Sequence, residues 1–267
     1  MDRVGERVSP SETVGTPYDR PDLYDLVLDG LDFDIPFWTE WARQAHGPVL
    51  DVGCGTGRVL LRLLAAGIDA DGLDNSEAML ARARARAEAA GHRPGLVLGD
   101  MRDFTMPRRY ARVICTFNAF AHCETPDDQI AALRCMREHL EPNGALALHL
   151  SYPTPSYWSE PDGEPVLETE ARHPDNGHTL QMWDTRTKDL IGQRQRSEVE
   201  IRELDPGGRL VASFRSVTTQ RWCYRFELEL LLRLAGFSRW EFHGGFAGET
   251  LSSEHSQIVA QAWRDDA

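Results

Sequence analysis

The chain has 267 residues, of which 41% are hydrophobic, and its formal net charge is −13 at pH 7. An acidic chain is a poor partner for phosphate backbones, so the charge argues against nucleic-acid binding. The sequence contains no run of about 18 apolar residues, and its polar start lacks the apolar stretch of a signal peptide. We therefore expect a cytoplasmic protein without a membrane span, large enough for one core that carries an insertion.

Five cysteines are scattered along the sequence without a Cys-x-x-Cys pair and without histidines at metal-ligand spacing. They are Cys54, Cys115, Cys123, Cys135 and Cys223. This placement is typical of buried free thiols in a reducing compartment, and we expect no structural metal.

Short apolar runs alternate with helical stretches between residues 49 and 150, which indicates βαβ units around a parallel sheet. The predicted strands cover residues 49–52, 70–73, 96–98, 113–116 and 145–150. The predicted helices between them cover residues 58–66, 77–90 and 125–140. Asn75 or Ser76 is expected to cap the second helix, and Thr125 is expected to open the third.

The pattern changes after Tyr152, where residues 153–165 are rich in proline and acids. The predicted strands that follow alternate apolar and polar residues around a strong turn, as antiparallel strands do. They cover residues 178–185, 193–204 and 210–224. A helix at 225–235 and strands at 238–243 and 259–263 then rejoin the first part. The predicted fold is α/β, with a mostly parallel seven-stranded sheet flanked by helices and an inserted antiparallel β-layer.

A glycine-rich segment, Asp51-Val52-Gly53-Cys54-Gly55-Thr56-Gly57, lies between the first strand and a helix. Glycines let the backbone turn tightly and approach a ligand, and the N–H groups of the following helix suit a carboxylate. The Gly-x-Gly-x-Gly spacing differs from that of NAD and FAD proteins, and the ending of a P-loop is absent. On its own, the segment could also be a turn without a ligand.

Two acids follow the next two strands. Asp74 ends the second strand, where a carboxylate can accept both hydrogens of a ribose diol. Asp100 and Met101 follow the third strand and can offer a carboxylate and a thioether to an adenine ring. Each acid alone is commonly a turn or cap residue, but the glycine motif and both acids in this order predict a cofactor site.

With these residues, the sequence resembles the class I S-adenosylmethionine-dependent methyltransferases from Tyr24 to Pro153, and again at Leu231-Leu232-Arg233-Leu234-Ala235-Gly236-Phe237. The resemblance implies a Rossmann-like fold that binds S-adenosylmethionine and releases S-adenosylhomocysteine. For Arg58, an exposed position at the helix start is an equal alternative to a cofactor contact. The cofactor-binding residues that the resemblance implies are Asp51, Gly53, Gly55, Gly57, Arg58, Asp74, Asn75, Asp100, Met101 and Phe117.

The segment Cys115-Thr116-Phe117-Asn118-Ala119-Phe120-Ala121-His122 is similar to that of amino-sugar N-methyltransferases, and glycine N-methyltransferase is a more distant relative. The resemblance implies that His122 takes a proton from the acceptor, with a hydrogen-bonding role in the loop as the alternative. It also implies that Tyr18 or Tyr24 enters the catalytic site.

Three further residues are expected on the acceptor side: Phe120, His149 and Tyr152. A structural role is the alternative for His149 and Tyr152, because a His or Tyr at a strand end is commonly structural. The aromatic residues Phe37, Trp38 and Trp41 are instead expected to pack a helix against the sheet.

The predicted parts are a mobile N-terminal lid at 1–30, a Rossmann-like core at 31–152 and 225–267, and a β-rich substrate cap at 153–224. The predicted function is methyl transfer from S-adenosylmethionine to a small-molecule amine in sugar or natural-product metabolism, including antibiotic biosynthesis. O-, C- or S-methylation of a small molecule is the close alternative. Two less favoured alternatives are a non-catalytic S-adenosylmethionine-binding protein and an NAD-dependent oxidoreductase. The oligomeric state is left open, with a homodimer as one option.

Overall fold

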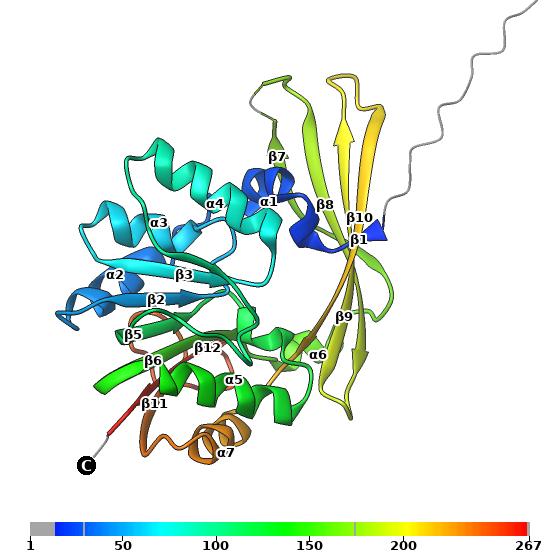
Figure 1. The fold of residues 1–267 in the computed structure, drawn as a ribbon. Coiled ribbons are helices and arrows are strands. Elements are labelled where there is room, and N and C mark those ends of the chain that lie inside the picture. Colours follow the sequence, from blue (N-terminus) through cyan, green and yellow to red (C-terminus); the bar gives the residue numbers. More distant parts are fainter. Residues whose placement is uncertain (1–13, 29, 174, 266–267) are drawn as a thin grey trace, which may run out of the picture.

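The structure, a computed structural model, describes residues 14–28, 30–173 and 175–265 (Figure 1). Residues 1–13 and 29 of the predicted lid lie outside this range. A seven-stranded sheet has the order β11-β12-β6-β5-β2-β3-β4. Only β12 runs antiparallel to its neighbours in this sheet. The strands are β2 (Val49–Val52), β3 (Ala70–Asp74), β4 (Leu96–Leu98), β5 (Tyr110–Cys115), β6 (Leu140–Ser151), β11 (Arg239–His243) and β12 (Gln257–Trp263).

Helices cover both faces of this sheet (Figure 1). They are α2 (Ile35–Arg43), α3 (Arg58–Ala65), α4 (Glu77–Ala89), α5 (Pro126–Glu138) and α7 (Arg225–Leu234). One apolar core packs α5 and α7 against the sheet, and a second packs α2 and α3. Trp38 and Trp41 are buried in the second core, as predicted, and Phe37 packs against it.

Local capping agrees with the predicted helix starts. The hydroxyl group of Ser76, rather than the side chain of Asn75, accepts a hydrogen bond from the Met79 N–H at the start of α4. Thr125 accepts from the Asp128 N–H at the start of α5. These bonds satisfy N–H groups that the first helical turn leaves without partners.

A second sheet stands beside the first and has the order β1-β10-β9-β8-β7. Its strands are β1 (Val14–Gly15), β7 (Pro165–Arg172), β8 (Thr179–Asp189), β9 (Arg194–Leu204) and β10 (Leu210–Arg221). Strands β7 to β10 are antiparallel, which confirms the predicted β-layer, and β1 adds to its edge in parallel. The predicted layer lacked β7 and β1.

The N-terminal segment connects the two sheets. It contains a 3₁₀ turn, η1 (Pro17–Asp19), and helix α1 (Pro21–Leu28), which lie near α4 and the second sheet (Figure 1). Leu23 of α1 is buried against Leu180 and Phe214 of the second sheet. On the other side, Arg82 and Arg86 of α4 form ion pairs with Asp25.

All five cysteines are buried and free. Among the described helices, none has the length and apolar character that crossing a bilayer requires.

Candidate active site

The glycine turn between β2 and α3 exposes backbone atoms that no glycine side chain covers. Gly53, Gly55 and Gly57 all have positive φ angles, of 74°, 56° and 87°. A Cβ atom on Gly53 would lie 2.6 Å from the Cβ of Ala119, whereas one on Gly55 would meet no atom within 4 Å. The turn therefore packs closely on one side and faces open space at Gly55, where a ligand can approach the backbone.

Asp74 at the end of β3 holds this turn. Its Oδ2 accepts a hydrogen bond of 2.7 Å from the Gly55 N–H, and its Oδ1 accepts one of 2.9 Å from the Ser76 N–H. A carboxylate oxygen has more than one acceptor direction, so Asp74 can still accept from a ribose diol. Burial raises the pKa of Asp74 above its ordinary value. Asn75, the next residue, is exposed.

The end of β4 lies beside the end of β3, because the Gly99 N–H donates to the Asp74 carbonyl oxygen at 3.0 Å. Asp100 follows directly and forms a 2.7 Å ion pair with Arg102, which holds the pKa of Asp100 below its usual range. Met101 is half-buried and packs against the main core. The structure thus brings the glycine turn, Asp74 and the turn at Asp100 to one edge of the sheet.

Asp51 lies in β2 directly before the turn and is buried. Its Oδ1 has no hydrogen-bond partner among the described residues, and burial raises its pKa to about 7. A buried acceptor without a donor is costly, and it suits a ligand that brings an N–H group. Backbone space, a diol acceptor and an orphaned acceptor together fit a nucleoside linked to an amino acid.

Arg58 at the start of α3 is buried, so the alternative of an exposed helix-start residue is wrong. Its guanidinium forms two hydrogen bonds with the Asp34 carboxylate, at 2.6 and 2.7 Å, and a third with the Leu31 carbonyl oxygen at 2.9 Å. The ring of Phe117 lies 5.0 Å from its Cζ. Asp34 was not predicted as a partner, because a single acid 24 positions away carries no spacing signal.

The turn after β5 is strained, since Phe117 and Asn118 have positive φ angles of 50° and 64°. His149 supports it: its Nδ1 accepts from the Phe117 N–H at 3.3 Å, and its carbonyl oxygen accepts from the Asn118 N–H at 3.1 Å. The Nε2 of His149 lies 3.2 Å from Gln257 Oε1, and burial lowers the pKa of the imidazole. The structure therefore gives His149 a role in supporting the turn.

The other two residues expected on the acceptor side lie in different environments. The side chain of Phe120 is fully buried in the main core. Tyr152 is half-buried, and its ring packs edge-on against that of Tyr224, with ring centres 6.0 Å apart.

His122 ends the short 3₁₀ turn η2 (Ala119–His122), which follows β5. Its Nε2 lies 2.6 Å from the hydroxyl oxygen of Tyr18, and its Nδ1 lies 3.5 Å from the hydroxyl oxygen of Thr218 on β10. Burial lowers the pKa of His122 and raises that of Tyr18. A protonated phenol therefore donates to a neutral imidazole at this contact. Thr218 was not predicted, because β10 has no motif.

Tyr18 also touches the cofactor side of the site, because its carbonyl oxygen accepts from the Ser76 hydroxyl group at 3.5 Å. The ring of Tyr24 lies 6.3 Å from that of Tyr18, and burial raises its pKa to about 12. Of the two candidate tyrosines, Tyr18 is the one in contact with His122.

Comparisons with known proteins agree with this geometry. Residues 49–144 match the family described as methyltransferase domain. The chain is 29% identical to a dTDP-3-amino-3,4,6-trideoxy-alpha-D-glucopyranose N,N-dimethyltransferase of Streptomyces venezuelae, over 87% of this chain and 96% of the relative. The chain contains a methyltransferase domain and is an S-adenosylmethionine-dependent methyltransferase. The methyltransferase uses S-adenosylmethionine to methylate a small molecule.

Two further proteins are similar to the methyltransferase over most of their length. The cypemycin N-terminal methyltransferase of a Streptomyces species is 28% identical over 89% of this chain and 93% of the relative. The solved structure of S-adenosylmethionine-bound CalS10, an amino pentose methyltransferase from Micromonospora echinaspora, has a TM-score of 0.68 and 25% identity, over 94% of this chain and 98% of that chain. A seven-stranded sheet with an added antiparallel sheet therefore has known catalytic counterparts.

Proposed function

We propose that the methyltransferase methylates the nitrogen of an amine on a sugar or another natural-product intermediate. The observation that carries this proposal is the 2.6 Å contact between Tyr18 and the neutral imidazole of His122, next to the strand ends that hold Asp74 and Gly55. An amine in its ammonium form must lose a proton before its nitrogen can attack the methyl group, and a neutral histidine can take that proton. Two similar proteins act, by their names, on a dTDP-linked amino sugar and at the N-terminus of cypemycin.

The proposed cofactor site follows the strand ends. The N–H groups of the glycine turn would meet the carboxylate of S-adenosylmethionine, and Asp51 would support this turn from below and accept from the amino group. Asp74 would accept from the ribose, beside Asn75. Asp100 and Met101 would hold the adenine, with Phe117 nearby. When bound, the cofactor supplies an electrophilic methyl group on sulfur.

The residues of this chain mainly align the acceptor with that methyl group and exclude water. At the base, the amine N–H proton passes to the Tyr18 oxygen while the phenol hydrogen passes to His122 Nε2. Tyr18 thus ends in the protonated form that its raised pKa favours. In this proposal residues 14–28 of the predicted lid carry Tyr18 into the site, and residues 153–224 form a substrate cap.

A panel of small amines, phenols and thiols, incubated with S-adenosylmethionine and the full chain, tests the proposal. We expect mass spectrometry to find methyl groups on amine nitrogens, with turnover that falls in His122→Ala while S-adenosylmethionine affinity is kept. Methylation of oxygen, carbon or sulfur without any amine product would contradict the proposal.

A further inference from the structure

The inner face of the second sheet extends the active site away from His122. Thr218 on β10, Ser197 on β9 and Arg186 on β8 are register partners across three adjacent strands. Such partners point to the same face of a sheet. Because Thr218 contacts His122, this face is the one turned toward the base. Two strand spacings separate Thr218 from Arg186, which is roughly 10 Å.

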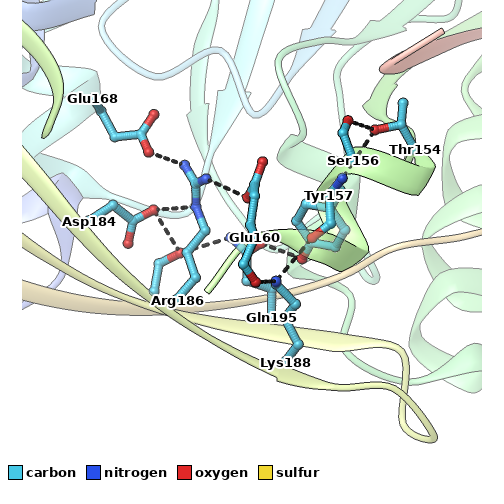
Figure 2. Close-up of polar contacts among 10 residues, drawn as sticks. Thr154, Ser156, Tyr157, Glu160, Glu168, Asp184, Arg186, Lys188 and Gln195 are labelled. Carbon is cyan, nitrogen blue, oxygen red and sulfur yellow. Dashed lines mark hydrogen bonds and ion pairs between the residues drawn. The ribbon is translucent and has the colours of Figure 1, made fainter. Parts of the chain in front are cut away.

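Acidic side chains surround Arg186 on this face (Figure 2). Its guanidinium contacts Asp184 at 2.8 Å, Glu168 at 2.6 Å and Glu160 at 3.6 Å. Three carboxylates around one guanidinium leave an excess of negative charge. The nearby Lys188 ammonium reduces this excess without cancelling it, and it donates to the carbonyl oxygens of Tyr157 and Glu160 at 3.0 Å.

Asp184 is the buried member of this cluster, with 9% of its side chain exposed. Its Oδ2 accepts from Arg186 Nε at 2.8 Å and from the Ser197 hydroxyl group at 3.2 Å. Its Oδ1 is buried and has no partner in the part of the chain that the structure describes. Leaving such an acceptor unpaired costs free energy, so the position points to a donor that a ligand supplies.

Burial raises the pKa of Asp184 and that of Glu168 above their ordinary values, and the charge of Arg186 offsets this effect only in part. A cation bound beside these carboxyl groups would favour their charged forms. Glu160 is about half exposed and has the longest contact with Arg186, so opening this contact costs little and gives access to the cluster.

We propose that Asp184, which lies on the same face of β8 as Arg186, binds a second amino group of the acceptor in its ammonium form. This inference rests on the proposed function, because it names the class of amine. The acceptor is then an unphosphorylated diamine, such as a diamino sugar, rather than a sugar nucleotide.

The charges around the site disfavour a diphosphate. Phosphate groups are recognised by guanidinium groups that offer free donor pairs. Arginines of the surrounding elements are paired with carboxylates instead: Arg20 with Asp22, Arg58 with Asp34, and Arg102 with Asp100 and Asp128. A diphosphate would displace these pairs and also meet the carboxylates around Arg186.

Calorimetry with the full chain saturated with S-adenosylhomocysteine tests this inference without turnover. The probes are methyl 6-amino-6-deoxyglucoside, methyl 2,6-diamino-2,6-dideoxyglucoside, the diamino sugar acetylated on one nitrogen, and a thymidine-diphosphate amino hexose. We expect the diamino sugar to bind about tenfold or more tightly than the other three. Equal binding of the mono- and diamino sugars, or tightest binding of the sugar nucleotide, would overturn the inference.

Variants locate the effect. In Asp184→Asn, the preference for the diamino sugar should disappear while S-adenosylhomocysteine affinity is kept. The matched control is Glu198→Gln, which removes one carboxylate from an exposed position on the opposite face of β9 and should keep the preference. The same loss in both variants would overturn the inference. If Asp184→Asn does not fold, the four probes on the wild type still decide.

The same sugars separate the inference from the proposed function. Amine methylation without any preference for the diamino sugar overturns the inference alone. Binding of the diamino sugar that depends on Asp184, followed by methylation of oxygen, overturns the proposed function and keeps the ammonium site.

Discussion

The hydroxyl group of Tyr18 lies 2.6 Å from Nε2 of His122, although 104 positions separate the two residues. The contact joins the N-terminal segment to the turn after β5. In the proposed reaction it carries the proton from the acceptor to the base.

Removal of this hydroxyl group tests the contact. Tyr18→Phe keeps the ring and the backbone contact with Ser76, so we expect kcat to fall about tenfold or more, with S-adenosylmethionine affinity nearly unchanged. Tyr24→Phe is the matched control, because Tyr24 lies in the same segment without contacting His122. A larger loss of kcat in Tyr24→Phe would assign the catalytic role to Tyr24.

The pH dependence of kcat tests His122. Burial lowers the pKa of His122 from its ordinary value of 6.5, so the imidazole is neutral and able to accept a proton above that value. We expect kcat to stay level as the pH falls to 6.5 and to drop below it, as His122 becomes protonated. In His122→Ala, kcat should be lower by about 10² to 10⁴ and this acid limb should be absent. An unchanged limb in the variant would assign it to another group.

Asp74 is expected to determine cofactor affinity. Asp74→Asn keeps the shape but replaces one acceptor oxygen of a carboxylate by a donor. We expect calorimetry to show S-adenosylhomocysteine binding weakened by about 1.5 to 3 kcal/mol, the usual contribution of a hydrogen bond to a charged group. Asp69→Asn makes the same charge change at an exposed position and should bind normally. Equal affinities of the two variants would contradict the assignment.

The ion pair between Arg58 and Asp34 is expected to stabilise the fold, because removal of one partner leaves a buried charge alone. We expect Arg58→Met to lower the free energy of unfolding by about 3 to 5 kcal/mol, measured by denaturant titration. The double variant with Asp34→Asn should recover part of this loss. If Arg58→Met instead weakens cofactor binding and keeps stability, Arg58 contacts the cofactor.

The cofactor side of the site could be predicted from sequence because its residues follow strand ends. Parallel strands place their carboxyl ends at one edge, so order along the chain predicts that Gly55, Asp74 and Asp100 meet. The structure brings the strand ends together in this way, through the Gly55–Asp74 and Gly99–Asp74 hydrogen bonds. The predicted α/β fold and its β-layer are also confirmed. They could be predicted because the periodicity of apolar residues reports on local structure.

Contacts between distant segments could not be predicted. Nothing near Arg58 indicates Asp34, and nothing near His122 indicates Thr218. Strand β7 was missed because most of its side chains are exposed, so it shows no apolar alternation, and Pro165 suggests a loop. On β8, Asp184 and Arg186 alternate with the polar residues of the other face, so the pattern does not show which face is buried.

Gly53 and Ala119 meet so closely that a side-chain carbon on Gly53 would lie 2.6 Å from the methyl group of Ala119. Ala119 begins the short turn that ends at His122. The cofactor loop and the segment that bears the base are therefore separated by a single methyl group. Exchange at either position for a bulkier residue would disturb both halves of the site at once, so the two positions are expected to vary together or not at all.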